Sequence, residues 1–192
     1  MALRSEESHQ AILDATISLV NPDEGEAISL QKLSIERIAR KAGVSKTTIY
    51  RWWPSKVAVV IDSFLDHHVA RTPVNKDLPP LEALREHFFS VAEVYGTGEG
   101  RLVAQLIAEC QHDPEAMKEF KERFWFNRRD TTTSLISNAQ DAGFIRADLP
   151  PSEVADILYS PLYFQLLMQT GPLNKEWARK LFSTALEGIR AR

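Results

Sequence analysis

The most constraining feature of this sequence is a pair of short helical patterns separated by one glycine, IERIARKAGVSKTTIYRWWP (residues 35–54). Ser34 and Ser45 are suitable N-caps, and Gly43 suits the left-handed end of the first helix. Pro54 disfavours helical geometry at Trp53, so the second helix must be short. The pattern predicts a helix-turn-helix, although unrelated pairs of helices can look similar.

The second of these helices has an unusual surface for its length. At the angular spacing of an α-helix, Ile49 and Trp53 share one row and can seat the helix on a core. The remaining rows hold hydrogen-bond donors, which suits contact with DNA. We expect the N-terminal residues to face base edges and the later ones to hold the sugar-phosphate backbone. The base-facing residues are Lys46, Thr47 and Thr48, and the backbone-facing residues are Tyr50, Trp52 and Lys56.

The charge of the chain is concentrated in the same region. Seven basic residues and a single acid, Glu36, lie between Lys32 and Lys56, whereas the whole chain has a net charge of −3. A compact positive patch on an otherwise acidic chain indicates a polyanionic partner at one place. A solvated charged face is the plainer interpretation and stays open.

The segment IERIARKAGVSKTTIYRWWPSKVAVV (residues 35–60) resembles the DNA-binding segment of the TetR (tetracycline-repressor-like) regulators. Two departures are visible: the loop from Asn21 to Leu33 is longer and lacks a Gly-aromatic pair, and Glu36 stands where some members place an arginine. Glu36 would face cytosine N4 or point away from the DNA. The resemblance, together with the surface pattern, gives a predicted DNA-contacting set: Ser34, Arg37, Ser45, Lys46, Thr47, Thr48, Tyr50, Trp52 and Lys56.

Helical periodicity continues along the chain, and we expect an all-α protein of about nine helices. The breaker-rich stretch TPVNKDLPP (residues 72–80) separates an N-terminal three-helix helix-turn-helix domain, residues 1–71, from a C-terminal helical domain, residues 80–192. That second domain is expected to bind an effector and to dimerise. A long helix should start at Asp113-Pro114, and Pro161 should kink or break the helix that begins at Ser152.

The last two predicted helices are apolar on several faces, which indicates either deep core or an interface between subunits. The resemblance favours the interface, because TetR regulators pair these helices with those of a second copy. RFWFNRRDTTTSLISNAQDAGFIRADLPPSEVADILYSPLYFQLL is also similar to the C-terminal domain of one TetR subgroup. The expected interface residues of the homodimer are Leu158, Leu162, Leu166, Leu181, Phe182 and Leu186.

The resemblance also implies a small-molecule effector pocket among the helices from residue 80 to 170. Aromatic residues at helical spacing are more often plain core than pocket, and both interpretations stay open at each position. The candidate lining residues are His112, Phe120, Phe124, Trp125, Asn127, Arg128, Tyr163, Phe164 and Met168.

An enzyme is not expected. Cys110, His112, Asp113 and Glu109 lie close in sequence, but no second Cys/His pair at zinc spacing and no base-orienting motif accompany them. We expect no cofactor, no membrane partner and a cytoplasmic, nucleoid-associated location. The expected function is a ligand-responsive regulator of the repressor type that binds a palindromic double-stranded DNA operator as a dimer. The alternative is a helical protein-interaction module that does not bind DNA.

Overall fold

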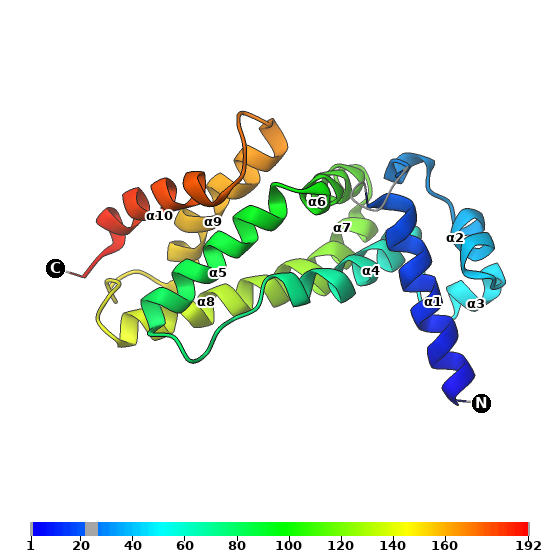
Figure 1. Cartoon of the computed structure of the whole chain (residues 1–192), viewed down its shortest axis with the longest axis horizontal. Helices are drawn as coiled ribbons and strands as arrows, with labels where there is room; N and C mark the ends of the chain where they lie inside the picture. The colour runs from blue at the N-terminus through cyan, green and yellow to red at the C-terminus, as the bar shows by residue number, and fades with distance from the viewer. Residues whose placement is uncertain (1, 22–26, 192) are drawn as a thin grey trace. The chain divides into compact units, whose positions relative to one another are not determined.

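The computed structural model describes residues 2–21 and 27–191, and these residues form a succession of helices (Figure 1). Within them no strand is present, and Ile145 and Arg190 form only an isolated bridge. The all-α prediction is confirmed. The elements are α1 (Ala2–Val20), the 3₁₀ turn η2 (Leu30–Lys32), α2 (Ile35–Ala42), α3 (Lys46–Tyr50), α4 (Lys56–Arg71), α5 (Pro80–Tyr95), α6 (Gly98–Cys110), α7 (Pro114–Phe120), the π-helical segment η3 (Lys121–Trp125), α8 (Phe126–Asp141), α9 (Pro151–Met168) and α10 (Lys175–Ile189).

The chain divides into two compact units that are not two consecutive stretches of sequence. The first unit comprises Met1–Val69 and Arg101–Trp125, and the second comprises Ala70–Gly100 and Phe126–Arg192. Most of α6 and all of α7 therefore belong with the helix-turn-helix. None of the described helices is both long enough and apolar enough to span a lipid bilayer.

The helix starts follow from short polar caps that were predictable from the sequence. Ser34 and Ser45 accept hydrogen bonds from the backbone N–H groups of the first turns of α2 and α3. Ser55, Asp113 and Asn174 do the same for α4, α7 and α10, at 3.0 Å, 3.0 Å and 2.9 Å respectively. The caps at Ser34 and Ser45, and the helix start at Asp113-Pro114, are as expected.

Two other local predictions differ from the structure. α9 continues through Pro161 without a break, because only one hydrogen bond is lost to the proline and both helix halves remain packed. The expected helix from Pro114 onward comprises three helical segments, with a π-helical stretch at Lys121–Trp125.

The first unit has a core in which the helix-turn-helix shares its apolar residues with α1, α4 and α6. Ile12 of α1, Ile38 of α2 and Ile49 of α3 have no exposed surface. Phe64 of α4 contacts Phe124 edge-on, with ring centroids 5.7 Å apart. The position of α3 is consequently determined by this one core.

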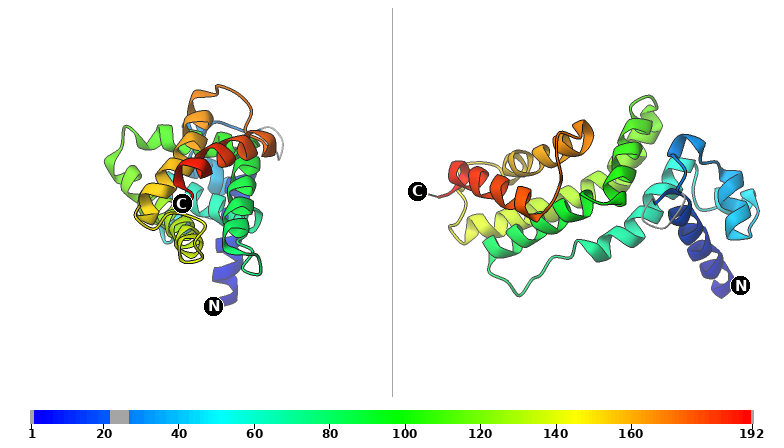
Figure 2. Two further views of the ribbon diagram at one scale, coloured as in Figure 1. Left: turned by 90° about the vertical axis from the view of Figure 1, so that its left-hand side faces the viewer. Right: turned by 45° about the horizontal axis from the view of Figure 1, so that its top comes forward.

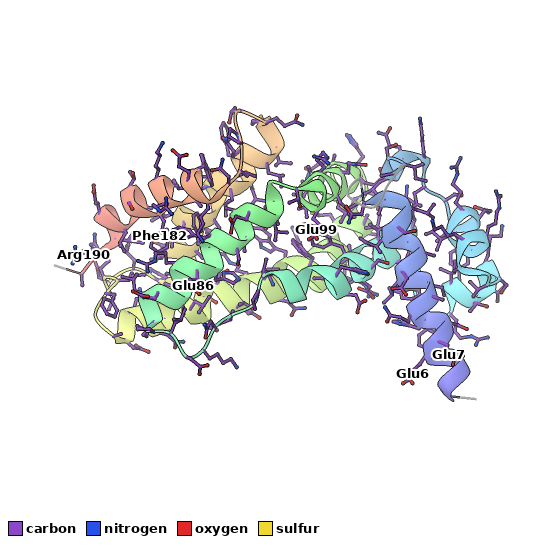
Figure 3. All side chains as sticks on the ribbon, viewed as in Figure 1. Glu6, Glu7, Glu86, Glu99, Phe182 and Arg190 are labelled. Atoms are coloured by element: carbon purple, nitrogen blue, oxygen red, sulfur yellow. The ribbon has the colours of Figure 1, made fainter. Side chains whose placement is uncertain are left out.

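The second unit is built from α5, α8, α9 and α10, whose contacts with one another are extensive (Figures 1 and 2). Phe182 of α10 points toward α5 (Figure 3), where its ring centroid lies 5.7 Å from Phe88 and 6.1 Å from Phe89. Leu158 and Leu162 of α9 are fully buried. This unit thus has an apolar core of its own.

The turn between α2 and α3 requires glycine at Gly43, whose φ is +68°. A side chain there meets no atom within 4 Å, so only backbone strain opposes it. We expect Gly43→Ala to lower the free energy of unfolding by about 1–2 kcal/mol, measured by urea denaturation. Gly188→Ala, in open space inside α10, is the matched control and should raise it by about 0.5–1 kcal/mol. Equal effects at both positions would contradict the strain argument.

Candidate DNA-binding site

α3 is held from behind by two buried side chains. Ile49 is fully buried and Trp53, just after the helix, is 1% exposed. The Trp53 indole N–H donates to Asp62 Oδ2 of α4 at 2.8 Å. Arg123 donates to both oxygens of the same carboxylate, at 3.2 and 2.9 Å. The predicted anchoring role of Trp53 is confirmed, and it includes a polar contact that the sequence pattern did not reveal.

The outer face of α3 carries exposed polar and aromatic side chains, as the helical rows predicted. Lys46 and Thr47 are exposed, Thr48 is half-buried, and Tyr50 and Trp52 are 55% and 38% exposed. The Trp52 ring lies edge-on to His9 of α1, with centroids 4.9 Å apart. A short helix with an apolar back and a donor-rich front is suited to lie in the major groove of DNA.

Ser34, Arg37 and Ser45 surround this face. Arg37 is exposed, and its backbone N–H donates to the Ser34 hydroxyl at 3.3 Å. The Ser45 hydroxyl accepts from the Thr48 N–H at 3.1 Å. Both serines are used as helix caps, and their contacts with DNA stay a prediction.

Lys46 is engaged by an acid of the neighbouring helix. Its ammonium donates to Glu36 Oε1 of α2 at 2.7 Å, and both side chains are more than half exposed. The hydrogen bond from Lys46 lowers the pKa of Glu36, and the same bond raises the pKa of Lys46. Glu36 therefore points toward Lys46 in this structure. Ten positions separate the two residues, and no local sequence signal pairs them.

Lys56 is held within the first unit rather than extended into solvent. Its ammonium donates to the Leu30 carbonyl oxygen and to Glu109 Oε1 of α6, both at 2.8 Å. The side chain is 23% exposed. The neighbouring Ser55 hydroxyl donates to Glu119 Oε2 of α7 at 2.6 Å. These contacts fasten the start of α4 to α6 and α7.

An acidic hollow of about 460 Å³ lies beside these contacts. Among its lining residues are four acids and Lys56: the acids are Glu109, Asp113, Glu115 and Glu119. Lys56 is predicted to contact a DNA phosphate, and in this structure its ammonium is bound to the Glu109 carboxylate. Because Glu109 is far away along the chain, no local pattern indicates this partner.

Comparison with known proteins identifies the family. A family profile described as "Tetracyclin repressor-like, C-terminal domain" matches residues 81–185, and one described as "Bacterial regulatory proteins, tetR family" matches residues 29–62. The HTH-type transcriptional regulator YdeS of Bacillus subtilis is 31% identical over 188 residues, which cover 98% of this chain and 92% of YdeS. The chain belongs to the TetR family of transcriptional regulators.

Other relatives are more distant. The HTH-type transcriptional repressor DhaR of Mycobacterium sp. is 23% identical over 162 residues, covering 81% of each chain. The crystal structure of the TetR family regulator SCO0332 superposes with a TM-score of 0.77 at 27% identity, covering 95% of this chain and 98% of that one. FadR of Bacillus subtilis, solved with stearoyl-CoA, has a TM-score of 0.70 at 16% identity over 94% and 98% of the two chains, a likeness that shows the fold alone.

The residues predicted to line an effector pocket have varied environments in this TetR-family regulator. Phe120 and Phe124 are buried in the core of the first unit, with ring centroids 5.1 Å apart. Trp125 is half-buried and His112 is exposed in the same unit. The plain core interpretation therefore holds for the two phenylalanines.

In the second unit, the other pocket candidates separate into inner and outer positions. Arg128 and Tyr163 are half-buried, and Asn127 is exposed. Phe164 and Met168, one helical turn apart on α9, are 61% and 59% exposed. These two face solvent, so the expectation that they line an interior pocket is corrected.

The predicted dimer residues need a similar correction. Leu158, Leu162, Leu166 and Phe182 are at most 7% exposed within a single chain, so they have almost no surface to offer to a second copy. Leu181 and Leu186 of α10 are half-buried. Four apolar side chains of α9 are exposed instead: Ile157, Phe164, Leu167 and Met168.

The environment of Cys110 does not resemble that of a catalytic thiol. Cys110 is 1% exposed, and burial raises its pKa to about 11, with Asp113 and Glu109 adding to the rise. A thiol that stays protonated at neutral pH is a poor nucleophile. His112 lies on the surface.

Within the described residues, one group has atoms close enough to share a metal ion: Asp14, Asp66 and His67. The Gln10 amide already donates to Asp14 at 3.0 Å and to Asp66 at 2.9 Å. His67 Nδ1 lies 2.9 Å from the Ser63 carbonyl oxygen. We assign these groups to polar contact between α1 and α4.

The Glu36–Lys46 pair gives a prediction about protonation. Because Glu36 raises the pKa of Lys46, Glu36→Gln should return that pKa toward the ordinary lysine value, as measured by NMR titration of the Lys46 side chain. The lowered pKa of Glu36 means that the pair persists below the pH at which an ordinary glutamate protonates and is lost as pH falls through the lowered value. The Glu176–Lys180 pair of α10 should be unchanged in the same spectra. An unaltered Lys46 titration in Glu36→Gln would show that the contact does not persist in solution.

Proposed function

We propose that this TetR-family regulator is a ligand-responsive repressor that binds a near-palindromic DNA operator as a homodimer. The observation that carries the proposal is the construction of α3. Its back is fastened by Ile49 and by the Trp53–Asp62 hydrogen bond, and its front presents Lys46, Thr47 and Tyr50 to solvent. A rigid short helix of this kind can enter the major groove with little loss of conformational freedom.

The proposed roles of the α3 side chains follow from their positions along the helix. Lys46, Thr47 and Thr48 lie in the first turn, where a recognition helix reaches base edges. Tyr50 is the last residue of α3 and Trp52 lies just beyond it, where hydroxyl and indole N–H groups meet phosphates. Lys56 adds a third backbone contact by turning from Glu109 toward a phosphate.

Glu36 modifies the proposed readout. A lysine alone donates to guanine O6 and N7, whereas a carboxylate accepts from cytosine N4. With the two groups 2.7 Å apart, each restricts where the other can point. The pair is therefore proposed to select a base-pair step of the DNA that presents a hydrogen-bond acceptor beside a donor.

Residues proposed to contact bases and residues proposed to contact phosphates are distinguished by their effect on the preference for particular DNA sequences. We expect Thr47→Ala to relax preference at particular base pairs by about 1–3 kcal/mol and Tyr50→Phe to weaken all duplexes alike. Lys46→Ala alone would leave the Glu36 carboxylate facing the DNA, so Lys46 is tested in the double variant Lys46→Ala/Glu36→Gln. The measurement is selection from random duplexes followed by titration against the selected and scrambled sites. Uniform losses in all the variants would contradict the proposed roles.

Dimerisation is proposed to use the exposed apolar face of α9. Ile157, Phe164 and Met168 recur at helical spacing on one side of the helix, and Leu167 lies beside them. An exposed apolar patch of this kind is typical of a contact surface. Two recognition helices must lie ~34–36 Å apart to enter successive major grooves, which one copy of the chain cannot provide.

The dimer is tested with substitutions that leave the core of the chain intact. Phe164→Glu should yield monomers in sizing with light scattering and weaken operator binding, because it places a charge in the apolar patch. Phe144→Glu is the matched control, since Phe144 is also an exposed aromatic residue, at 41%, but lies outside the patch. A dimeric Phe164→Glu protein, or a monomeric wild-type protein, would contradict the proposed dimer interface.

The relatives support repression and ligand response by analogy. DhaR is named a repressor, and the FadR structure contains stearoyl-CoA. The alternative function, a helical protein-interaction module, predicts no salt-dependent binding to duplex DNA. With six to ten phosphates neutralised, the proposed complex should lose ~10³–10⁵ in affinity between ~50 and ~200 mM salt.

A further inference from the structure

His9 of α1 contacts the two tryptophans that lie just beyond α3. Its ring stacks on Trp53, with centroids 4.7 Å apart and planes inclined by 28°. The Trp52 ring meets the same imidazole edge-on, with centroids 4.9 Å apart and planes inclined by 72°. α1 and the end of α3 lie side by side at this point (Figure 1). His9 therefore adjoins Trp52, whose indole is proposed to meet a DNA phosphate.

The imidazole nitrogens of His9 are open to an external partner. Within the described part of the chain neither nitrogen has a hydrogen-bond partner, and Ser18 Oγ is the one buried side-chain nitrogen or oxygen without a partner. Both nitrogens of the half-buried His9 consequently reach solvent. His67 and His87, in contrast, use Nδ1 on a backbone carbonyl oxygen and on a tyrosine hydroxyl. His9 is thus held by its ring, and its polar atoms are unused.

Trp53 fixes the base of this stack. Its indole N–H donates to Asp62 Oδ2 at 2.8 Å, and Arg123 is paired with the same carboxylate at 2.9 Å. Trp53 is 1% exposed, so its ring cannot turn away from His9, whereas Trp52 is 38% exposed. The contact with His9 restricts the rotamers of this more exposed ring. Less conformational freedom is then lost when Trp52 meets a phosphate.

A protonated imidazole in this position can hold a phosphate. A cation over the face of an indole is attracted by the negative charge of the π-system. The protonated ring donates from both nitrogens, whereas the neutral ring donates from only one. Backbone phosphates of DNA are negatively charged, and their oxygens accept hydrogen bonds. The protonated form of His9 is therefore the form that a DNA phosphate selects.

The charged groups around the stack keep their charges in the pH range where histidine changes its own. The residues beyond α3 bring two uncharged indoles into contact with His9. Behind them, Asp62 of α4 is paired with Arg123. Glu6, one turn earlier on α1, is exposed near the free end of the helix (Figure 3). Carboxylates and guanidinium groups stay charged between about pH 6 and about pH 8, whereas histidine gains a proton as pH falls through this range.

We propose that His9 is a further DNA-contacting residue, whose protonated imidazole binds a backbone phosphate while its ring holds the Trp52 indole toward the DNA. The inference rests on the proposed function and extends the proposed contact set to α1. Because the bound form is the protonated one, DNA binding takes up a proton at His9 wherever the free protein carries the neutral ring. Affinity for duplex DNA should accordingly rise as pH falls through the range in which histidine titrates.

The experiment measures the affinity of the full chain for one selected and one scrambled duplex at constant ionic strength. Between about pH 8 and about pH 6 we expect the affinity of a dimer, with two His9 side chains, to rise by about 3- to 30-fold. The rise should be equal for both duplexes, because phosphate contacts have no sequence preference. Calorimetry in two buffers of different ionisation enthalpy should show proton uptake on binding.

Two substitutions separate the charge of His9 from its packing. His9→Phe keeps an aromatic ring on Trp53 and removes both nitrogens, so it should bind as weakly as the wild type at about pH 8 and show no pH dependence. His9→Arg supplies a permanent cation that also stacks on aromatic rings, and it should restore the affinity at every pH. His67→Gln is the matched control, since it removes another histidine that links α1 and α4 and should leave the pH profile unchanged.

The outcomes distinguish this inference from the proposed function. If the wild type binds duplexes with no pH dependence, if His9→Phe keeps the wild-type profile, or if His9→Arg binds no better than His9→Phe, His9 only packs α1 on α3 and the inference is wrong. In each of these cases duplex binding itself persists, so the proposed function stands. Failure of the wild type to bind any duplex at any pH would overturn both.

Discussion

The arrangement of the candidate DNA-binding site depends on the burial of one tryptophan. Trp53 lies just beyond α3 with its ring in the core and its N–H bonded to Asp62, which is also bound by Arg123. A buried donor needs its acceptor, so the indole has one favourable orientation. α3 spans only Lys46–Tyr50, too short to be stable alone. The direction of every exposed side chain on α3 therefore follows from this packing.

The positive surface of the first unit is moderated by its own acids. Lys46 is paired with Glu36 in solvent, and Lys56 is paired with Glu109 in a half-buried position. The two pairs differ in consequence, because an exposed pair is screened by salt and rearranges easily. The Lys56 pair also connects α4 to α6 and is supported by a bond to the Leu30 carbonyl. The chain is thus less cationic toward DNA than its count of basic residues indicates.

Features encoded within a few residues were predictable from the sequence. Ser34 and Ser45 cap helices as expected, and Gly43 has the left-handed conformation that its place required. The TetR resemblance, which rested on the same segment, is confirmed by the family comparison. Local chemistry decides these features, so a single sequence contains the necessary information.

Features that depend on distant partners were not predictable in the same way. Leu158 and Leu162 were expected at the interface between two copies, yet they lie in the core of one chain. The sequence shows how many faces of a helix are apolar. It does not show which of these faces packs within its own subunit. Pro161 does not break α9, since packing on both sides outweighs the single lost hydrogen bond. Glu109 binds Lys56 and Glu36 binds Lys46 although each pair lies on different helices. No periodic pattern in the sequence indicates such pairs.

The contact between Lys56 and Glu109 has a thermodynamic consequence for the proposed complex. A phosphate that approaches Lys56 meets an ammonium whose charge is already shared with α6. The two anions compete for one cation, and coupling between competing partners is reciprocal. The free energy by which the Lys56–Glu109 contact weakens DNA binding equals the free energy by which DNA binding weakens that contact. The contact between α4 and α6 should consequently be weaker in the DNA-bound protein than in the free protein.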